Sequence, residues 1–234
     1  HQIFGGFIIG KLIDSLIIGI LTFMVMSFLQ MPYTLLISVI MFAINPFFSW
    51  LNQLLADALN SLSGANSILL GVILGGMMSI DMGGPFNKAA YVFGTASLAY
   101  QTEAGYMIMA AVMVGGMVPP IAIAIASWVF KNKFTDNDRK TAPVNAIMGL
   151  CFISEAAIPY AAGDPLHVIP PCVIGSAVAG ALSMAFKCTL MAPHGGIFVF
   201  PVVGNALMYI IALAIGSIVG AVMLGLLRKP VESK

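Results

Sequence analysis

Five polar side chains suited to hydrogen-bonding a ligand stand in otherwise apolar stretches of the sequence. Three of them, Asp81, Asn87 and Lys88, surround Gly83-Gly84-Pro85, which cannot lie in the middle of a helix. Charged groups at membrane depth are costly and normally face a partner or a polar cavity. We therefore predict a hairpin tip whose side chains line a site for a hydroxylated substrate. The alternative is an Asp81–Lys88 ion pair that braces the turn.

Glu155 is the fourth of these side chains, and no basic residue stands between Lys140 and Lys187 to neutralise it. A carboxylate in an apolar run is costly unless it finds hydrogen-bond donors. The hydroxyl groups of a polyhydroxylated substrate can supply them, so Glu155 is predicted to bind substrate. The alternative is a structural glutamate that bonds to the backbone at a helix break.

His194 is the fifth, in the sequence Pro193-His194-Gly195-Gly196, which favours a loop. Its imidazole is predicted to hydrogen-bond a substrate hydroxyl, or the group that receives a phosphate. A structural histidine is the alternative. Asp164 is interpreted as a turn or cap residue before the next helix, and His167 as a residue at a helix end.

The composition excludes an ordinary soluble domain. Of 234 residues, 60% are hydrophobic and 8% charged, with a mean hydropathy of +1.01, whereas soluble folds carry about 25% charged residues. The net charge of +1 provides no basic field for nucleic acid. No nucleotide-binding loop, metal-ligand spacing or nucleophile elbow is present, so no cofactor, metal or catalytic residue is expected. The three cysteines are interpreted as packing thiols.

The elements that must position these residues are membrane helices, because the apolar runs are too long for barrel strands. Spans are expected at 3–30, 33–50, 104–130, 166–186 and 204–227, with an amphipathic interfacial helix over 50–62. The span 104–130 is expected to kink at Pro119-Pro120.

Basic residues in the segment 131–140 and in the C-terminal tail predict that both are cytoplasmic. An even number of crossings must join two cytoplasmic segments, and the spans 166–186 and 204–227 supply two. The short, Gly- and Pro-broken segments 142–165 and 188–203 are therefore predicted to enter the membrane and return. The fold class is an all-α integral membrane protein, a multi-span helical bundle with re-entrant hairpins.

A weak internal similarity links 67–85 with 145–159. In each, an apolar stretch runs to an acidic residue, Asp81 or Glu155, and a proline follows four residues later. Paired, interrupted segments of this kind are typical of the substrate site of a transporter.

Several motifs in order resemble the fructose-type enzyme IIC of the bacterial phosphoenolpyruvate-dependent sugar phosphotransferase system. The resemblance covers about 60–205. It rests on the segments 60–66, 81–91, 117–120, 152–160, 163–170 and 192–198.

The resemblance implies an inner-membrane fructose permease, usually a homodimer, whose sugar is phosphorylated during transport by a phosphocysteine on a partner IIB component. In the family a glutamate in a re-entrant hairpin binds the sugar, and Glu155 stands at that motif. The segments that contain Asp81, Lys88 and His194 are implied to surround the same site. Ser154 and His167 depart from the usual threonine and arginine of the pattern, which leaves the exact sugar open.

The expected organisation is a IIC membrane domain over 1–234, without the N-terminal spans usual for the family. It divides into spans and an interfacial helix over 1–62, substrate-binding hairpins and spans over 63–204, and a last span with a cytoplasmic tail over 205–234. An ion-coupled secondary transporter, in which Asp81 and Glu155 bind H⁺ or Na⁺, is the alternative. An intramembrane enzyme would need a nucleophile–base pair, and the sequence shows none.

Overall fold

The computed structural model describes residues 2–40, 42–43, 46, 67–99 and 101–231, with the side chains of 2–12 and 14 left undescribed. The chain forms two compact units, His1–Ala58 and Leu59–Lys234. The interfacial helix expected over 50–62 lies outside the described residues.

The first unit begins with the helix α1 (Gln2–Phe28). Gln30 and Tyr33, on either side of Pro32, have positive φ angles of 52° and 60°, and the chain is helical again over 34–40. The two helical segments pack closely, since a Cβ on Gly19 would lie 3.3 Å from the Cβ of Phe42. The helix expected over 3–30 and the start of the one expected over 33–50 are confirmed as helices.

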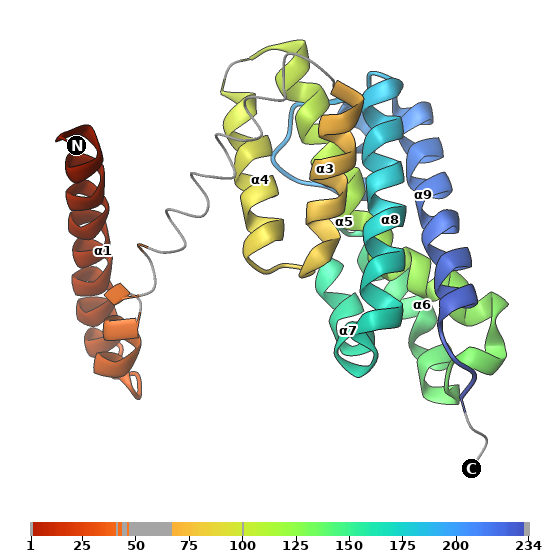
Figure 1. Ribbon diagram of the computed structural model, residues 1–234, viewed down its shortest axis with the longest axis horizontal. Helices are drawn as coiled ribbons and strands as arrows, with labels where there is room; N and C mark the ends of the chain where they lie inside the picture. The colour runs from red at the N-terminus through yellow and green to blue at the C-terminus, as the bar shows by residue number, and fades with distance from the viewer. Residues whose placement is uncertain (1, 41, 44–45, 47–66, 100, 232–234) are drawn as a thin grey trace. The chain divides into compact units, whose positions relative to one another are not determined.

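The second unit contains seven described α-helices (Figure 1). Their bounds are α3 (Ser67–Ile80), α4 (Pro85–Leu98), α5 (Glu103–Val129), α6 (Asp136–Leu150), α7 (Ile158–Gly163), α8 (Pro165–Ala185) and α9 (Ala206–Leu227). Three 3₁₀ segments, Lys131–Lys133, Ser154–Ala157 and Ile197–Val202, and two short strands, β1 (Thr189–Leu190) and β2 (Val203–Gly204), complete the unit. Among the described helices, α5, α8 and α9 are long and apolar enough to cross a membrane, which agrees with three of the predicted spans.

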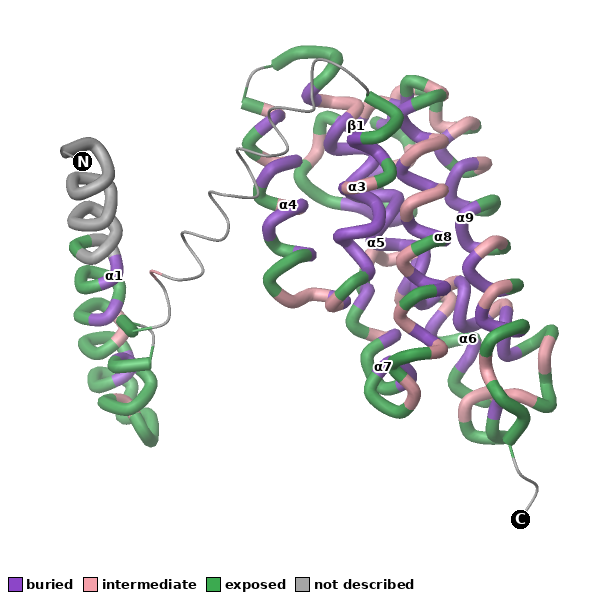
Figure 2. Tube along the Cα trace, viewed as in Figure 1, coloured by how far each residue is buried: buried purple, intermediate pink, exposed green. Residues whose placement is uncertain are grey.

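Helix α5 forms the centre of this unit. It contacts α3, α4, α6, α8 and α9, and most of its residues are buried (Figure 2). Pro119 and Pro120 lie inside it without ending it. Small residues let its neighbours approach, because a Cβ on Gly115 would lie 2.7 Å from the Cα of Gly75 in α3. Such close packing stabilises helix pairs in lipid, where no hydrophobic effect drives them together.

The shorter helices come in pairs separated by a break. Helices α3 and α4 have 14 residues each and α6 has 15, which corresponds to about 21–23 Å at 1.5 Å per residue. Met82 and Gly83, between α3 and α4, have φ angles of 47° and 121°, and Phe152, after α6, has 63°. The two segments of similar sequence therefore have a similar form: a helix, a break that carries an acid, and a second helix with a proline in its first turn, at Pro85 in α4 and at Pro159 in α7. In the second segment the acid lies in the 3₁₀ turn Ser154–Ala157.

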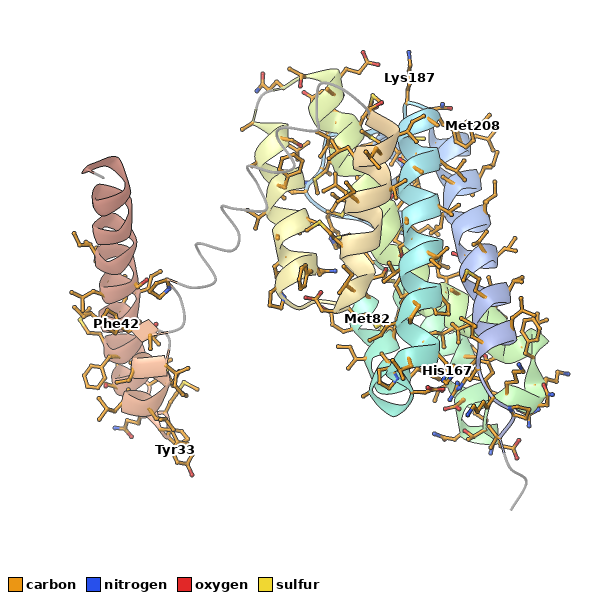
Figure 3. All side chains as sticks on the ribbon, viewed as in Figure 1. Tyr33, Phe42, Met82, His167, Lys187 and Met208 are labelled. Atoms are coloured by element: carbon orange, nitrogen blue, oxygen red, sulfur yellow. The ribbon has the colours of Figure 1, made fainter. Side chains whose placement is uncertain are left out.

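The basic segment 131–140 and the C-terminal tail lie together at one end of this unit. The N–H of Val231 donates to the carbonyl of Asn132 at 3.0 Å. The guanidinium of Arg228 lies 4.4 Å from the ring centroid of Phe134. Figure 3 labels His167 toward the same end of α8 and Lys187 beyond its opposite end. The contact between Val231 and Asn132 agrees with loop and tail lying on one side of a membrane, and that this side is the cytoplasm stays a prediction.

The two ends of the segment 188–203 lie next to each other. Strands β1 and β2 pair antiparallel, with Thr189 opposite Gly204 and Leu190 opposite Val203. This small sheet was not predicted. It closes the neck of a loop whose tip contains His194.

Candidate functional site

The break after α3 meets the break after α6. Oε1 of Glu155 lies 3.0 Å from the position that a Cβ on Gly83 would occupy, and Cγ and Cδ of Glu155 lie 3.4 Å from it. Gly83 also has a φ of 121°, which L side chains rarely adopt. Glycine at this position therefore permits both the turn and the approach of Glu155.

The loop with His194 reaches the same place. A Cβ on Gly195 would lie 2.5 Å from Cδ2 of Phe152. The imidazole of His194 stands edge-on to the Phe152 ring, with centroids 5.8 Å apart. The hydroxyl of Tyr91 in α4 donates to the carbonyl of Pro193 at 2.8 Å. Three segments far apart in sequence, 81–91, 152–155 and 193–195, thus converge, and we call this region the hairpin junction.

Glu155 is exposed at the hairpin junction. Its carboxylate has no hydrogen-bond or ion-pair partner among the described residues, so the backbone bond that the structural alternative requires is not seen there. His194 is also exposed, and its ring contact with Phe152 leaves both nitrogens without a partner in the described part of the chain. Both side chains therefore have hydrogen-bonding capacity for a ligand.

The carboxylate of Asp81 accepts hydrogen bonds from backbone N–H groups. Its Oδ2 accepts from the N–H of Phe86 at 2.7 Å, and its Oδ1 accepts from the N–H of Asn87 at 3.0 Å. These are the first free donors of α4, where a carboxylate is favoured by capping and by the helix dipole. Asp81 therefore holds the turn against the start of α4.

Asn87 is also held in place, and Lys88 is not. The Asn87 side chain is 6% exposed, and its Nδ2 donates to the carbonyl of Met78 at 2.7 Å. Lys88 is exposed, and it forms no ion pair with Asp81 in the described structure. The ion pair offered as an alternative is wrong because the donors of α4 take the Asp81 oxygens instead.

Two contributors to the hairpin junction were missed from sequence, Tyr91 and Phe152. Tyr91 stands four residues after Asn87 in α4, so the helical period places both on one face, and this spacing was an available signal. Phe152 gave no local signal, because its role depends on a φ of 63° and on contacts with Gly195 and His194.

Curated relatives were found at high identity. A PTS system fructose-specific EIIABC component of Bacillus subtilis is 48% identical over 194 residues, 82% of this chain. A fructose permease IIC component of Bacillus amyloliquefaciens is 50% identical over 194 residues, and a fructose-specific EIIC component of Haloferax volcanii is 47% identical over 175. The chain is homologous to the IIC components of fructose-specific phosphotransferase systems. The resemblance inferred from the motifs is confirmed.

This chain spans 30% of the Bacillus subtilis protein, 62% of the Bacillus amyloliquefaciens permease and 46% of the Haloferax protein. No protein-family model matches it, and no solved structure matches it. The hairpin junction lies within 60–205, the stretch on which the motif resemblance rests.

Asp164 and His167 lie at the end of the unit that contains the basic segment. Asp164 separates α7 from α8, and its Oδ1 lies 2.6 Å from Nδ1 of His167 in the first turn of α8. The carbonyl of Asp164 accepts from the N–H of Val168 at 3.0 Å. Both residues lie at the start of α8, as expected, and the Asp164 side chain bonds to His167 rather than to a backbone N–H of the helix.

Proposed function

We propose that this chain translocates fructose, or a close analogue, as the membrane part of a phosphotransferase system. The observation that carries the proposal is the exposed carboxylate of Glu155, which has no partner among the residues that the structure describes, at a junction of three polar segments. Relatives about 50% identical are named as fructose permease and fructose-specific EIIC components, which supports the same substrate.

In this proposal Glu155 accepts hydrogen bonds from sugar hydroxyls. His194 bonds a second hydroxyl, or the one that receives the phosphate. Asp81 and Asn87 are positioning residues that shape the turn beside Glu155, and the exposed ammonium of Lys88 contributes to sugar binding. A carboxylate, an imidazole and an ammonium together provide acceptors and donors, which is what a neutral polyol requires.

We also propose that the two broken helix pairs are re-entrant hairpins. A hydrocarbon core about 30 Å thick is not crossed by helices of about 21–23 Å. Non-helical backbone at membrane depth is tolerated where it is buried in protein or lines a cavity. The breaks at 81–84 and 151–157 meet each other and the loop with His194, which supports the proposal.

The proposed location is the inner membrane of a bacterium, with the basic end of the second unit in the cytoplasm. The positive-inside rule supports this orientation. The phosphoryl donor is a phosphorylated IIB component, on a separate chain or a further domain, and relatives named EIIB'BC and EIIABC support such a partner. The protein is expected to act as a homodimer.

Uptake of radiolabelled fructose into membrane vesicles from cells that produce the full-length protein tests the function. With soluble phosphotransferase components inside, uptake is expected to require phosphoenolpyruvate, to yield sugar phosphate and to persist with a proton uncoupler. The purified protein alone is expected to bind fructose without phosphorylating it. Uptake that needs no phosphoenolpyruvate and collapses with the uncoupler would instead establish the ion-coupled transporter.

A further inference from the structure

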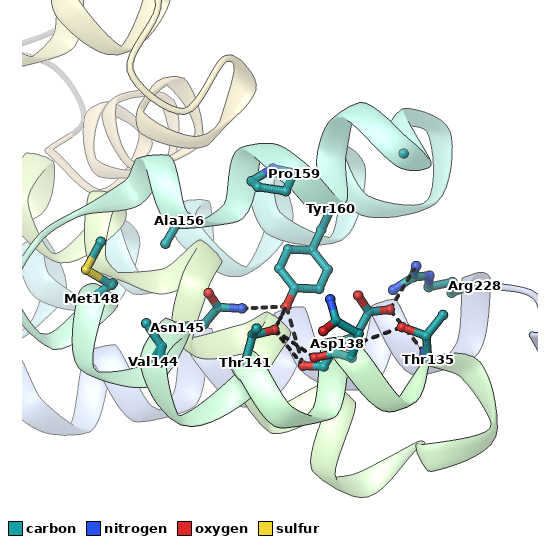
Figure 4. A pocket seen from close by; sticks show the side chains of 12 residues that line it. Thr135, Asp138, Thr141, Val144, Asn145, Met148, Ala156, Pro159, Tyr160 and Arg228 are labelled. Carbon is teal, nitrogen blue, oxygen red and sulfur yellow. Dashed lines mark hydrogen bonds and ion pairs between the residues drawn. The ribbon is translucent and has the colours of Figure 1, made fainter.

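A cavity of about 580 Å³ opens between α6, α7 and the C-terminal end of α9 (Figure 4). Its size falls in the range of small-molecule sites, roughly 300–1,000 Å³. The hairpin junction does not include it. Its lining mixes apolar side chains such as Val144 and Met148 with hydroxyl, amide and guanidinium groups.

The polar groups on one wall form a connected cluster. The phenol oxygen of Tyr160 accepts from Nδ2 of Asn145 at 2.8 Å and shares a hydrogen bond with the hydroxyl of Thr141 at 2.8 Å. Tyr160 is 8% exposed and Asn145 is 6% exposed. The Thr141 hydroxyl also lies 3.2 and 3.0 Å from the carbonyls of Asn137 and Asp138, so the protein engages the hydroxyl protons of Thr141 and Tyr160. Acceptor lone pairs of the two hydroxyls and the amide oxygen of Asn145 remain, and these can accept from sugar hydroxyls.

Arg228 places a positive charge on another wall. Its side chain is 16% exposed, its Nη2 lies 3.9 Å from Oδ2 of Asp138, and its buried Nη1 has no hydrogen-bond partner among the described residues. Asp138 is itself engaged by the N–H of Thr135 at 3.1 Å, as part of the cap of α6. A buried guanidinium donor without an acceptor is costly, so an anionic acceptor in the cavity is favoured.

The surrounding charge favours an anion as well. The segment 131–140 and residues 228–229 carry six basic and two acidic side chains. They gather at this end of the unit. The resulting positive potential attracts a phosphate group more than a neutral sugar.

The cavity lies directly behind the turn that carries Glu155. Ala156 and Pro159, the first and fourth residues after Glu155, line it. The Ser154–Ala157 turn therefore contributes to both sites. Glu155 belongs to the hairpin junction, and the next residue, Ala156, lines this cavity.

We propose that this cavity is a binding site for the phosphorylated sugar, the product that leaves the hairpin junction toward the cytoplasm. The phosphate lies against Arg228, and the sugar hydroxyls bond to the cluster of Tyr160, Asn145 and Thr141. The inference rests on the proposed function, since it takes a hexose phosphate as the product.

Binding of fructose, fructose 1-phosphate, fructose 6-phosphate and inorganic phosphate to the full-length protein in nanodiscs tests the site by calorimetry. Tyr160→Phe removes one hydroxyl, and Arg228→Gln removes the charge. Each is expected to weaken binding of at least one of the two hexose phosphates, Arg228→Gln by about tenfold or more, because the lost bond is charge-assisted. Neither is expected to change fructose affinity.

Lys229→Gln is the matched control, since it removes the same charge from an exposed neighbour that does not line the cavity. It should leave hexose-phosphate binding near wild type.

If Arg228→Gln does not fold, Tyr160→Phe and Asn145→Ala carry the test. The inference would be overturned if the protein bound no hexose phosphate, or if the cavity variants bound it as tightly as wild type. Fructose binding that stayed intact in the same experiment would leave the proposed function standing. Inorganic phosphate that binds as tightly as the hexose phosphates, with no effect of Tyr160→Phe, would show a plain anion site and equally overturn it.

Discussion

The acidic residues at the two helix breaks have opposite surroundings. Asp81 accepts two backbone N–H donors from α4, whereas Glu155 is exposed and without a partner in the described structure. A hydrogen-bonded carboxylate supports the backbone, and a free one is available to a ligand. The two acids, which the internal similarity equates, therefore have different expected phenotypes.

Glu155→Gln is expected to fold normally and to bind fructose about tenfold more weakly. The amide keeps the shape and one acceptor, but charge-assisted hydrogen bonds contribute roughly 1.5–3 kcal/mol against about 1 for neutral ones. Calorimetry with fructose measures the loss, and Glu103→Gln, an exposed glutamate in the first turn of α5, is the control. Lower thermal stability with unchanged affinity would assign Glu155 to bracing the break.

Gly83→Ala is expected to cost stability and fructose affinity together. The new Cβ would stand 3.0 Å from Oε1 of Glu155 on a backbone with a φ of 121°. Strain of this kind amounts to roughly 1–3 kcal/mol, and the carboxylate must move. Thermal unfolding and fructose binding measure the two effects. Gly163→Ala is the matched control, because nothing lies within 4 Å of its Cβ position.

At the level of elements, the start of α4 depends on the carboxylate of Asp81. Pro85 opens the helix, and Gly84 at its N-cap provides no side-chain bond. The first N–H donors of a helix must be satisfied from outside it. Asp81, five and six residues before the donors it serves, does so across the turn.

Asp81→Ala is therefore expected to lower the free energy of unfolding by about 1–2 kcal/mol, the usual loss for a helix cap. Asp81→Asn keeps one acceptor oxygen and should lose less. Thermal unfolding of the purified full-length protein ranks the two variants. An Asp81→Asn protein with wild-type stability but abolished fructose binding would contradict the capping role and assign Asp81 directly to the ligand.

At the level of the whole second unit, the ends of α8 belong to opposite faces. Helix α8 has 21 residues, about 31 Å at 1.5 Å per residue, which matches a hydrocarbon core of about 30 Å. The tail after α9 contacts the basic segment before α6 through Val231 and Asn132. His167, in the first turn of α8, lies toward the same end of the unit (Figure 3), so both segments are expected on the face at which α8 begins.

Cysteine labelling of intact cells with a membrane-impermeant maleimide tests this arrangement. The introduced cysteines of Asn137→Cys and Lys229→Cys are expected to stay unlabelled until the cells are opened, whereas that of Lys187→Cys should react from outside. All three side chains are exposed. Labelling of Asn137→Cys from outside with protection of Lys187→Cys would reverse the orientation, and one-sided labelling of all three would refute α8 as a span.

The fold class, the long apolar helices and the helix breaks could be predicted from the sequence because they depend on local properties. Long apolar runs predict α5, α8 and α9, Gly83-Gly84-Pro85 predicts the end of α3, and the basic residues of 131–140 predict the side shared with the tail. The hydropathy and the backbone stereochemistry of a short segment depend on its own residues and not on the rest of the chain.

Which polar residues remain free was settled only by the tertiary structure. Asp81 and Asn87 looked as suited to a ligand as Glu155 did, but the N–H groups of α4 and the carbonyl of Met78 occupy them. The meeting of Gly83, Glu155 and the loop at Gly195, and the cavity between Tyr160 and Arg228, join residues more than 30 positions apart. A hydrogen-bond partner is chosen by proximity in space, and that proximity exists only after the helices have packed.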